Sequence, residues 1–283
     1  MTIGDANKRV NELLQTIYPP GEVVVMGDWL MESVTGLRKT TFRLKADLSL
    51  DKEQENKFEW SLQRLLHHEP IQYVLNEAWF CGLKFYVDQN VLIPRPETEE
   101  LVEWIISNCR FPVDELSILD IGSGSGCIPI ALKRRIRKAL VYGLDISKGT
   151  IDVAEKNAVS LGADVRLMEI NFLDSSTWKT LPRADIIVSN PPYVPEQDKQ
   201  SMSPNVLEFE PHTSLFVPDH DPLVFYRAIG QFGLSHLNKS GEIYLEIHEN
   251  HGGAVLDLFK ELNYTTEIKK DLQGKNRMVR AVF

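Results

Sequence analysis

The stretch that most restricts the fold is residues 118–145, where two short apolar segments flank a glycine-rich run and the second ends in an acid. Residues 118–121 predict a strand, and residues 127–132 predict the helix that follows it. The glycines between them let the backbone turn sharply into the helix N-terminus and approach a ligand closely. A second predicted strand, residues 140–144, leads into Asp145. This order of strand, loop, helix and strand predicts a parallel α/β unit.

The acid after the second strand indicates a nucleoside ligand. Asp145 lies 19 residues after Gly126, a placement at which a carboxylate accepts hydrogen bonds from the ribose hydroxyls of an adenosine. A tight turn with no ligand is the alternative. The loop lacks the last glycine of dinucleotide sites and the Lys-Ser/Thr of phosphate-binding loops, so S-adenosylmethionine is the predicted cofactor. Its predicted contacts in the loop are Gly122, Ser123, Gly124, Ser125 and Gly126.

A second polar turn follows the apolar run at residues 186–188, which is typical of a central parallel strand. Pro191 and Pro192 end that strand, and they bias Asn190 toward an extended conformation. The side-chain oxygen of Asn190 and the main-chain oxygen of Pro191 can accept both hydrogens of one amino or amide nitrogen, while Tyr193 lies against its flat face. We therefore predict catalytic roles for Asn190, Pro191 and Tyr193. Substrate contacts are predicted for these three residues and for Pro192. An ordinary Asn-Pro turn is the alternative.

Other polar residues are expected at the same edge of the sheet. Residues 165–170 predict a third strand, which leads to Asn171 and Phe172. An amide beside an aromatic ring is suited to binding adenine, so both are predicted cofactor contacts. Asp145 and Asn190 complete the predicted cofactor site.

The remaining pattern predicts the fold class. After the four strands already named, the pattern predicts a helix that begins at Pro222 and a strand at 242–247. Another helix follows, and then two strands at 265–270 and 278–283. Alternating strands and helices that close in a hairpin predict an α/β fold, a doubly wound, Rossmann-like sheet of seven strands with an antiparallel end.

The N-terminal third has a different pattern. Apolar residues recur at helical spacing, which predicts a small helical bundle over residues 1–72. Residues 73–95 predict a linker with a short β-hairpin, and residues 96–283 form the predicted catalytic domain. Pro96 suits the first position of the helix that opens this domain. The two prolines around Arg95, Pro94 and Pro96, make that segment stiff, so it is a candidate wall of a site.

Composition excludes several classes of function. The formal net charge of −9 disfavours a large nucleic-acid footprint, and stable DNA binding is not expected. Three cysteines without Cys-x-x-Cys spacing predict neither disulfides nor a zinc cluster, and His248 and His251 lack metalloprotease spacing, so no metal is expected. No segment predicts export or membrane insertion, so a cytoplasmic protein is expected. Nothing indicates an oligomer.

These motifs carry a family resemblance. The chain resembles the class I S-adenosylmethionine-dependent methyltransferases, and specifically the release factor glutamine methyltransferase (PrmC/HemK) family, over nearly its full length. The segments that carry the resemblance are residues 69–73, 91–99, 118–126, 189–193 and 210–211. The Asn-Pro-Pro-Tyr motif also occurs in adenine-N6 DNA methyltransferases and some guanine-N2 RNA methyltransferases, so by itself it indicates only methylation of an amino nitrogen.

The resemblance implies an activity and a partner. The enzyme would transfer a methyl group to the side-chain amide nitrogen of the glutamine in the Gly-Gly-Gln loop of class I peptide chain release factors. These factors act in translation termination. The N-terminal bundle would dock the factor. Two alternatives remain open at this point: methylation of an exocyclic amine in DNA or RNA, and a non-catalytic sensor of an adenosine ligand.

Overall fold

The computed structural model describes residues 1–111 and 116–283. The chain forms two compact units. The first contains Met1–Glu77 together with Ser203–Phe209, and the second contains Ala78–Met202 and Glu210–Phe283.

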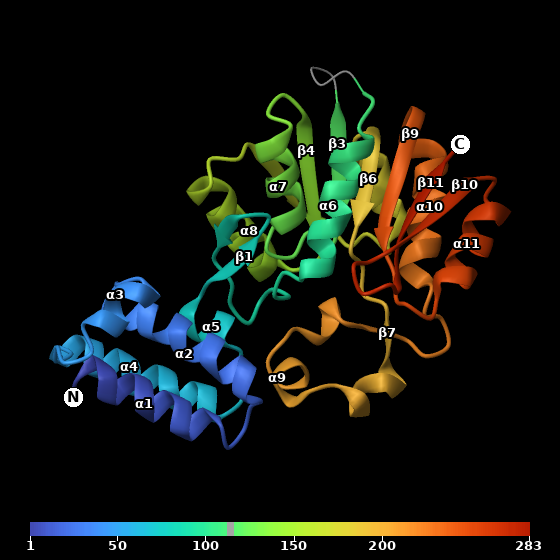
Figure 1. Cartoon of the computed structure of the whole chain (residues 1–283). Coiled ribbons are helices and arrows are strands. Elements are labelled where there is room, and N and C mark those ends of the chain that lie inside the picture. The colour runs from blue at the N-terminus through green and yellow to red at the C-terminus, as the bar shows by residue number, and fades with distance from the viewer. Residues whose placement is uncertain (112–115) are drawn as a thin grey trace. The chain divides into compact units, whose positions relative to one another are not determined.

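The first unit is a helical bundle, as the sequence predicts (Figure 1). Capping boxes open two of its longer helices, with Thr2 and Asp5 at one start and Asp51 and Gln54 at the other. Val10, Leu30, Leu62 and other apolar residues of these helices are buried in a core of their own. The helices are α1 (Ile3–Leu14), α2 (Pro20–Thr35), α3 (Lys39–Leu44), α4 (Lys52–Leu66) and α5 (Ile71–Leu75), and the returning segment adds α9 (Pro204–Leu207).

A seven-stranded sheet forms the centre of the second unit, in the order β10-β11-β9-β6-β3-β4-β5 (Figure 1). The five strands β9, β6, β3, β4 and β5 are parallel to one another, whereas β11 is antiparallel to both β9 and β10. The predicted α/β fold class and antiparallel end are therefore confirmed. The strands are β3 (Ser117–Ile121), β4 (Leu140–Asp145), β5 (Val165–Glu169), β6 (Ala184–Ser189), β9 (Leu237–Glu246), β10 (Thr265–Lys270) and β11 (Asn276–Val282).

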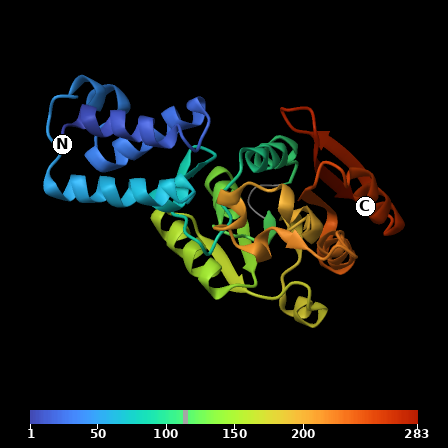
Figure 2. The ribbon, with the colours of Figure 1, turned by 90° about the horizontal axis from the view of Figure 1, so that it is seen from below.

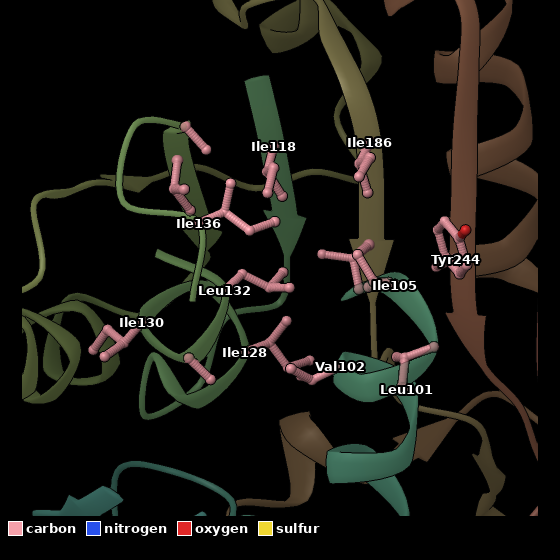
Figure 3. Packing of buried hydrophobic residues seen from close by; sticks show 14 of the residues in the cluster. Leu101, Val102, Ile105, Ile118, Ile128, Ile130, Leu132, Ile136, Ile186 and Tyr244 are labelled. Carbon is pink, nitrogen blue, oxygen red and sulfur yellow. The ribbon is translucent and has the colours of Figure 1, made fainter. Parts of the chain in front are cut away.

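Helices cover both faces of this sheet, which is the doubly wound arrangement. On one face, α6 and α7 direct Leu101, Val102 and Leu132 toward strand residues such as Ile118 and Ile186 (Figure 3). The other face packs against α10 and α11, and Figure 2 shows α6 and α10 on opposite sides of the strands. These helices are α6 (Pro96–Asn108), α7 (Cys127–Arg135), α8 (Lys148–Ser160), α10 (Val224–His236) and α11 (Gly252–Glu261).

Short elements complete the unit. A hairpin of β1 (Ala78–Phe80) and β2 (Leu83–Phe85) precedes α6, inside the range for which a hairpin was predicted. Two-residue strands β7 (Val194–Pro195) and β8 (Phe216–Val217) pair in parallel. The 3-10 helices are η1 (Ser175–Thr180), η2 (Glu196–Ser201) and η3 (His212–Ser214).

Several element boundaries differ from the sequence prediction, and the starts of β9 and α10 are two of them. Strand β9 begins at Leu237 rather than at residue 242, because the Leu237 end of the strand pairs with Ala184 across an irregularity in the register. Helix α10 begins at Val224 rather than at Pro222, since residues 221–223 form a turn in which the Val224 amide donates to the Asp221 carbonyl. Among the described residues, no helix is long and apolar enough to cross a membrane.

Gly143 of β4 provides a test of how closely the sheet packs under the glycine-rich loop. A Cβ atom at this position would lie 2.6 Å from the Ser123 Oγ and 2.8 Å from the Leu167 Cδ2. We expect Gly143→Ala to lower the free energy of unfolding by about 1–3 kcal/mol, since neighbours must move to accept the methyl group. Urea unfolding followed by circular dichroism measures this change.

Gly253→Ala in α11 is the matched control, because nothing lies within 4 Å of its added Cβ. It should be neutral or slightly stabilising in a helix. Equal stability of the two variants would contradict the close packing at Gly143.

Candidate active site at the carboxyl edge of the sheet

The central strands bring three polar segments to one edge of the sheet. Strand β3 pairs in parallel with β4 on one side and with β6 on the other. The carboxyl ends of all three strands therefore lie together, at the point where the strand order reverses, and open α/β sheets bind ligands there. Ile121 is paired with Ser189, so the glycine-rich loop and the Asn190 turn leave the sheet side by side.

The loop that follows β3 has a conformation that requires its glycines. Gly122, Gly124 and Gly126 have φ values of 76°, 54° and 80°, where side chains with a Cβ are strained. The backbone amides of Gly122 and Ser123 donate to the Leu144 carbonyl at 2.9 and 2.8 Å. These bonds hold the loop over the end of β4.

Asp145 is linked directly to this loop. Its carboxylate accepts from the Gly124 amide at 3.0 Å and from the Ser147 amide at 3.2 Å. Burial raises the pKa of Asp145, although these backbone hydrogen bonds oppose the shift. A carboxylate offers about four acceptor positions, so these backbone amides do not use all of them and capacity remains for a ligand.

Asp120 is a site residue that the sequence analysis treated only as part of a strand. Its side chain is fully buried, and neither carboxylate oxygen has a hydrogen-bond partner among the described residues. Burial raises the pKa of Asp120 to about 7, opposed by the nearby Ser123 side chain and reinforced by a smaller contribution from the charge of Asp145. The signal in the sequence is an acid inside an otherwise apolar strand. The Ser125 hydroxyl is likewise buried without a described partner, at the far end of the loop.

Asn157 of α8 is a second residue that the sequence analysis missed. It is 1% exposed, and its Nδ2 donates to the carbonyls of Ser125 and Tyr86, both at 2.9 Å. Its Oδ1 accepts from the Tyr86 amide at 2.7 Å. One buried amide therefore connects the glycine-rich loop to the segment after the β1–β2 hairpin.

The Asn190 turn is anchored by hydrogen bonds to three other elements. The Ser189 hydroxyl donates to the Ile121 carbonyl at 2.6 Å, which fixes the end of β6 to β3. The Nδ2 of Asn190 donates to the Thr98 Oγ1 of α6 at 3.1 Å. Pro191 is buried, and its carbonyl accepts no hydrogen bond from the described residues. The Tyr193 hydroxyl donates to Glu246, at the end of β9, at 3.1 Å.

Arg95 lies just before α6, in the segment predicted as a candidate wall of the site. Its contact with Glu210 fixes this segment. It donates to the Glu210 carboxylate at 2.5 Å, and the Ile93 amide donates to the other oxygen at 3.1 Å. The Glu210 side chain is only 1% exposed. These contacts hold residues 93–95 in place ahead of the helix that carries Thr98.

Asn171 and Phe172 follow β5, the edge strand that lies next to β4 in the sheet. Asn171 is exposed, and its Oδ1 accepts from the Leu173 amide at 3.2 Å. The Phe172 ring is 5% exposed and stacks on Trp178, with the ring of Phe232 at its edge. The ring therefore anchors this segment in the core and leaves the Asn171 side chain at the surface.

Of the residues predicted from the sequence, the structure joins the loop and Asp145 by a direct hydrogen bond and joins Asn190 to Tyr193 through Thr98 and Glu246. Within the described part of the chain, the side chains of Asn171 and Phe172 form no hydrogen bond with either group. The described residues contain no group of three or more His, Cys, Asp or Glu side chains able to hold a metal ion.

This sheet order, with a glycine-rich loop after its first strand and an acid after its second, defines a class I methyltransferase fold. A solved methyltransferase from Pyrococcus furiosus has the same fold, with a TM-score of 0.50 and 15% identity over 78% of this chain and 96% of that one. Residues 6–75 match the PrmC N-terminal domain family, and residues 99–208 match the methyltransferase small domain family.

Relatives with high sequence identity narrow the class. A release factor glutamine methyltransferase of Flavobacterium psychrophilum is 40% identical over 286 residues, covering 100% of both chains. The protein of the same name from Bacteroides thetaiotaomicron is 39% identical, covering 96% of this chain and 97% of that one. The chain belongs to the release factor glutamine methyltransferase family.

The isolated Asp120 carboxyl predicts a pH-dependent effect on stability. Its pKa is raised from the ordinary value of 3.8 to about 7. At a pH between these two values, the folded state retains a proton that the unfolded state has already lost. Stability contributed by the neutral carboxyl is therefore full below pH 3.8 and is lost as the pH rises through about 7. Asp120→Asn cannot ionise and avoids this loss.

The quantity to compare is the free energy of unfolding of Asp120→Asn minus that of the natural protein. We expect this difference to increase between about pH 4 and pH 7 and then level off, with a total change of at most roughly 4 kcal/mol. Urea unfolding at a series of pH values without cofactor measures the difference. A difference that is constant over this range would show that Asp120 has an ordinary pKa.

Proposed function

We propose that this chain transfers the methyl group of S-adenosylmethionine to the side-chain amide nitrogen of a glutamine in peptide chain release factors. Membership in the family supports the substrate class. The single observation that carries the chemistry is the Asn190 turn, where an amide oxygen and the free Pro191 carbonyl lie at the strand end beside the glycine-rich loop. Because release factors act on the ribosome, we expect the enzyme to work in the cytoplasm.

The residues at the loop fit the proposed cofactor. The glycines leave room for a ligand against the backbone, and Asp145 keeps acceptor positions for the ribose hydroxyls. The buried carboxylate of Asp120 has no hydrogen-bond donor among the described residues. The α-ammonium group of the cofactor could supply one, whereas its sulfonium has no N–H group to donate. S-adenosylmethionine, when bound, supplies an electrophilic methyl group on sulfur. We further propose that Ser123 and Ser125 line this cradle.

We assign the adenine end of the same ligand to the segment after β5. Asn171 has a free amide nitrogen at the surface, and Phe172 holds the segment through its stacking on Trp178. An exposed amide can hydrogen-bond the edge of a base. Phe172 contributes any ring contact only through the small part of its surface that is not buried.

The substrate amide is placed by acceptors. The Oδ1 of Asn190 and the Pro191 carbonyl would take the two N–H groups of the glutamine side chain, and Pro192 and Tyr193 would flank its flat face. Holding the nitrogen in line with the methyl group accounts for much of the catalysis, since positioning two reactants can lower a barrier by about 7–11 kcal/mol.

No general base is assigned. The lone pair of an amide nitrogen is delocalised into the carbonyl, which makes it a poor nucleophile. Two hydrogen-bond acceptors on its N–H groups increase the electron density on nitrogen and favour the pyramidal geometry that forms as the methyl group is gained. The nitrogen becomes acidic only after that gain, so its proton can leave afterwards.

Asn190→Ala tests the assignment of the nucleophile site. We expect the turnover number to fall by about 10²- to 10³-fold, as when one preorganised polar contact is removed from other enzymes. The cofactor dissociation constant should change little. Asn190→Asp keeps acceptors but adds a negative charge near the sulfonium, so it should also turn over slowly without weakened cofactor binding.

Single-turnover methylation of a release factor, with calorimetry for the cofactor, measures both effects. Near-normal transfer by Asn190→Ala would remove the turn from the chemistry and leave it as a structural strand end.

We also propose that the N-terminal helices, residues 1–72, dock the release factor, that residues 73–95 are a linker, and that residues 96–283 carry catalysis. The bundle buries its own apolar core, whose members all precede residue 78. This core supports a separate role for the bundle.

Removing residues 1–77 should leave cofactor affinity and methylation of a short glutamine peptide intact. The kcat/KM for the whole release factor should fall by at least about tenfold, which corresponds to losing roughly 1.4 kcal/mol of binding. Equal kcat/KM for the whole factor would contradict the docking role.

A further inference from the structure

A buried network connects the proposed nucleophile site to a carboxylate outside it. The Glu246 side chain, at the end of β9, is only 1% exposed. One of its oxygens accepts from the Thr98 hydroxyl at 2.6 Å, and the other accepts from the Tyr193 hydroxyl at 3.1 Å. The Thr98 oxygen in turn accepts from the Nδ2 of Asn190 at 3.1 Å. The four side chains come from α6, the turn after β6 and the end of β9.

The direction of each hydrogen bond follows from the chemistry of the carboxylate. An ionised carboxylate can only accept, and a threonine hydroxyl has a single hydrogen to donate. Because Thr98 gives that hydrogen to Glu246, its oxygen can only accept from Asn190. The NH2 group of Asn190 must therefore face Thr98, and its Oδ1 must point away.

The same carboxylate also orients the aromatic side of the site. The Tyr193 hydroxyl donates to the carboxylate oxygen that Thr98 does not use, so one carboxylate holds both side chains. Burial raises the pKa of Glu246, and the hydrogen bonds from Thr98 and Tyr193 together with the positive charge of Arg277 on β11 oppose this rise. Arg277 is itself fixed by Asp271 at 3.1 Å.

We propose that Glu246 and Thr98 are positioning residues that fix the orientation of the Asn190 amide, so that the site presents an acceptor to an NH2 group. This inference rests on the proposed role of Asn190. With the amide reversed, the site would present N–H donors, which suit a carbonyl or carboxylate oxygen. The network therefore makes the site select glutamine over glutamate.

Thr98→Val tests the network, because valine has the shape of threonine without the hydroxyl. We expect kcat on a release factor to fall by about 10- to 100-fold, because nothing then fixes the orientation of the Asn190 amide. KM for the factor and the cofactor dissociation constant should stay within about threefold, less than 1 kcal/mol. Thr98→Ser restores a hydroxyl and should recover most of the lost rate.

Thr150→Val is the matched control. Thr150 is 4% exposed, and its hydroxyl donates to the Asn90 carbonyl at 2.8 Å, outside the site. This variant loses one buried hydrogen bond as Thr98→Val does, so both should lower the melting temperature similarly. Only Thr98→Val should lower kcat. Equal losses of kcat in the two variants would overturn the inference.

Glu246→Gln provides a second variant of unchanged shape, in case Thr98→Val does not fold. A glutamine can donate to the Thr98 oxygen, which frees the hydroxyl to donate to Asn190 and reverses its amide. We expect kcat to fall and the binding preference for a glutamine peptide over the matching glutamate peptide to shrink by at least about tenfold, or 1.4 kcal/mol. An unchanged preference in a folded variant would overturn the inference.

A double-mutant cycle separates this inference from the proposed function. In an Asn190→Ala background, Thr98→Val should cost no further rate, because the amide that it orients is gone. If the two losses multiply, Thr98 acts independently of Asn190 and the inference fails. If Asn190→Ala alone keeps near-normal kcat, the proposed role of Asn190 fails instead. A slow Asn190→Ala with a normal Thr98→Val would overturn only the inference.

Discussion

The parallel pairing of β3 with both β4 and β6 is the constraint on which the site depends. It places the loop after β3, Asp145 after β4 and Asn190 after β6 at one edge of the sheet. Apolar helices α6 and α7 on one face and α10 on the other then bury this pairing, so the edge cannot shift without disturbing the core (Figure 3). The strand order therefore places the proposed cofactor site and the proposed substrate site side by side.

At this edge the enzyme retains buried polar groups whose energetic cost is offset in different ways. Glu246 receives two hydrogen bonds, and Glu210 receives one from Arg95 and one from a backbone amide. Asp120 receives none from the described residues. Burying such a group without a partner costs free energy, and that cost is reversed when a ligand supplies the missing donor. In the proposed site, the hydrogen-bonded carboxylates lie on the substrate side, and Asp120 would gain a donor from the cofactor.

The sequence could predict the parts of the fold that depend on local patterns. The strand at 118–121, the glycine loop and Asp145 are close in sequence, and the apolar run before Asn190 identifies a central strand without other information. The network around Asn190 could not be predicted in this way. Thr98 and Glu246 are 148 residues apart, and Asn190 and Thr98 are 92 apart, so only the tertiary fold brings them together. Asn157 was missed for the same reason, because its partners Tyr86 and Ser125 lie 71 and 32 residues away.

The central claim is that the Asn190 turn presents a release-factor glutamine to S-adenosylmethionine. The most direct test incubates the enzyme with methyl-labelled cofactor and, separately, with a release factor, the same factor with its Gly-Gly-Gln glutamine changed to asparagine, DNA and RNA. The account predicts one labelled methyl group on the glutamine nitrogen of the natural factor, located by peptide mass spectrometry, and none on the variant factor or the nucleic acids. Label in DNA or RNA, or equal label on the variant factor, would contradict it.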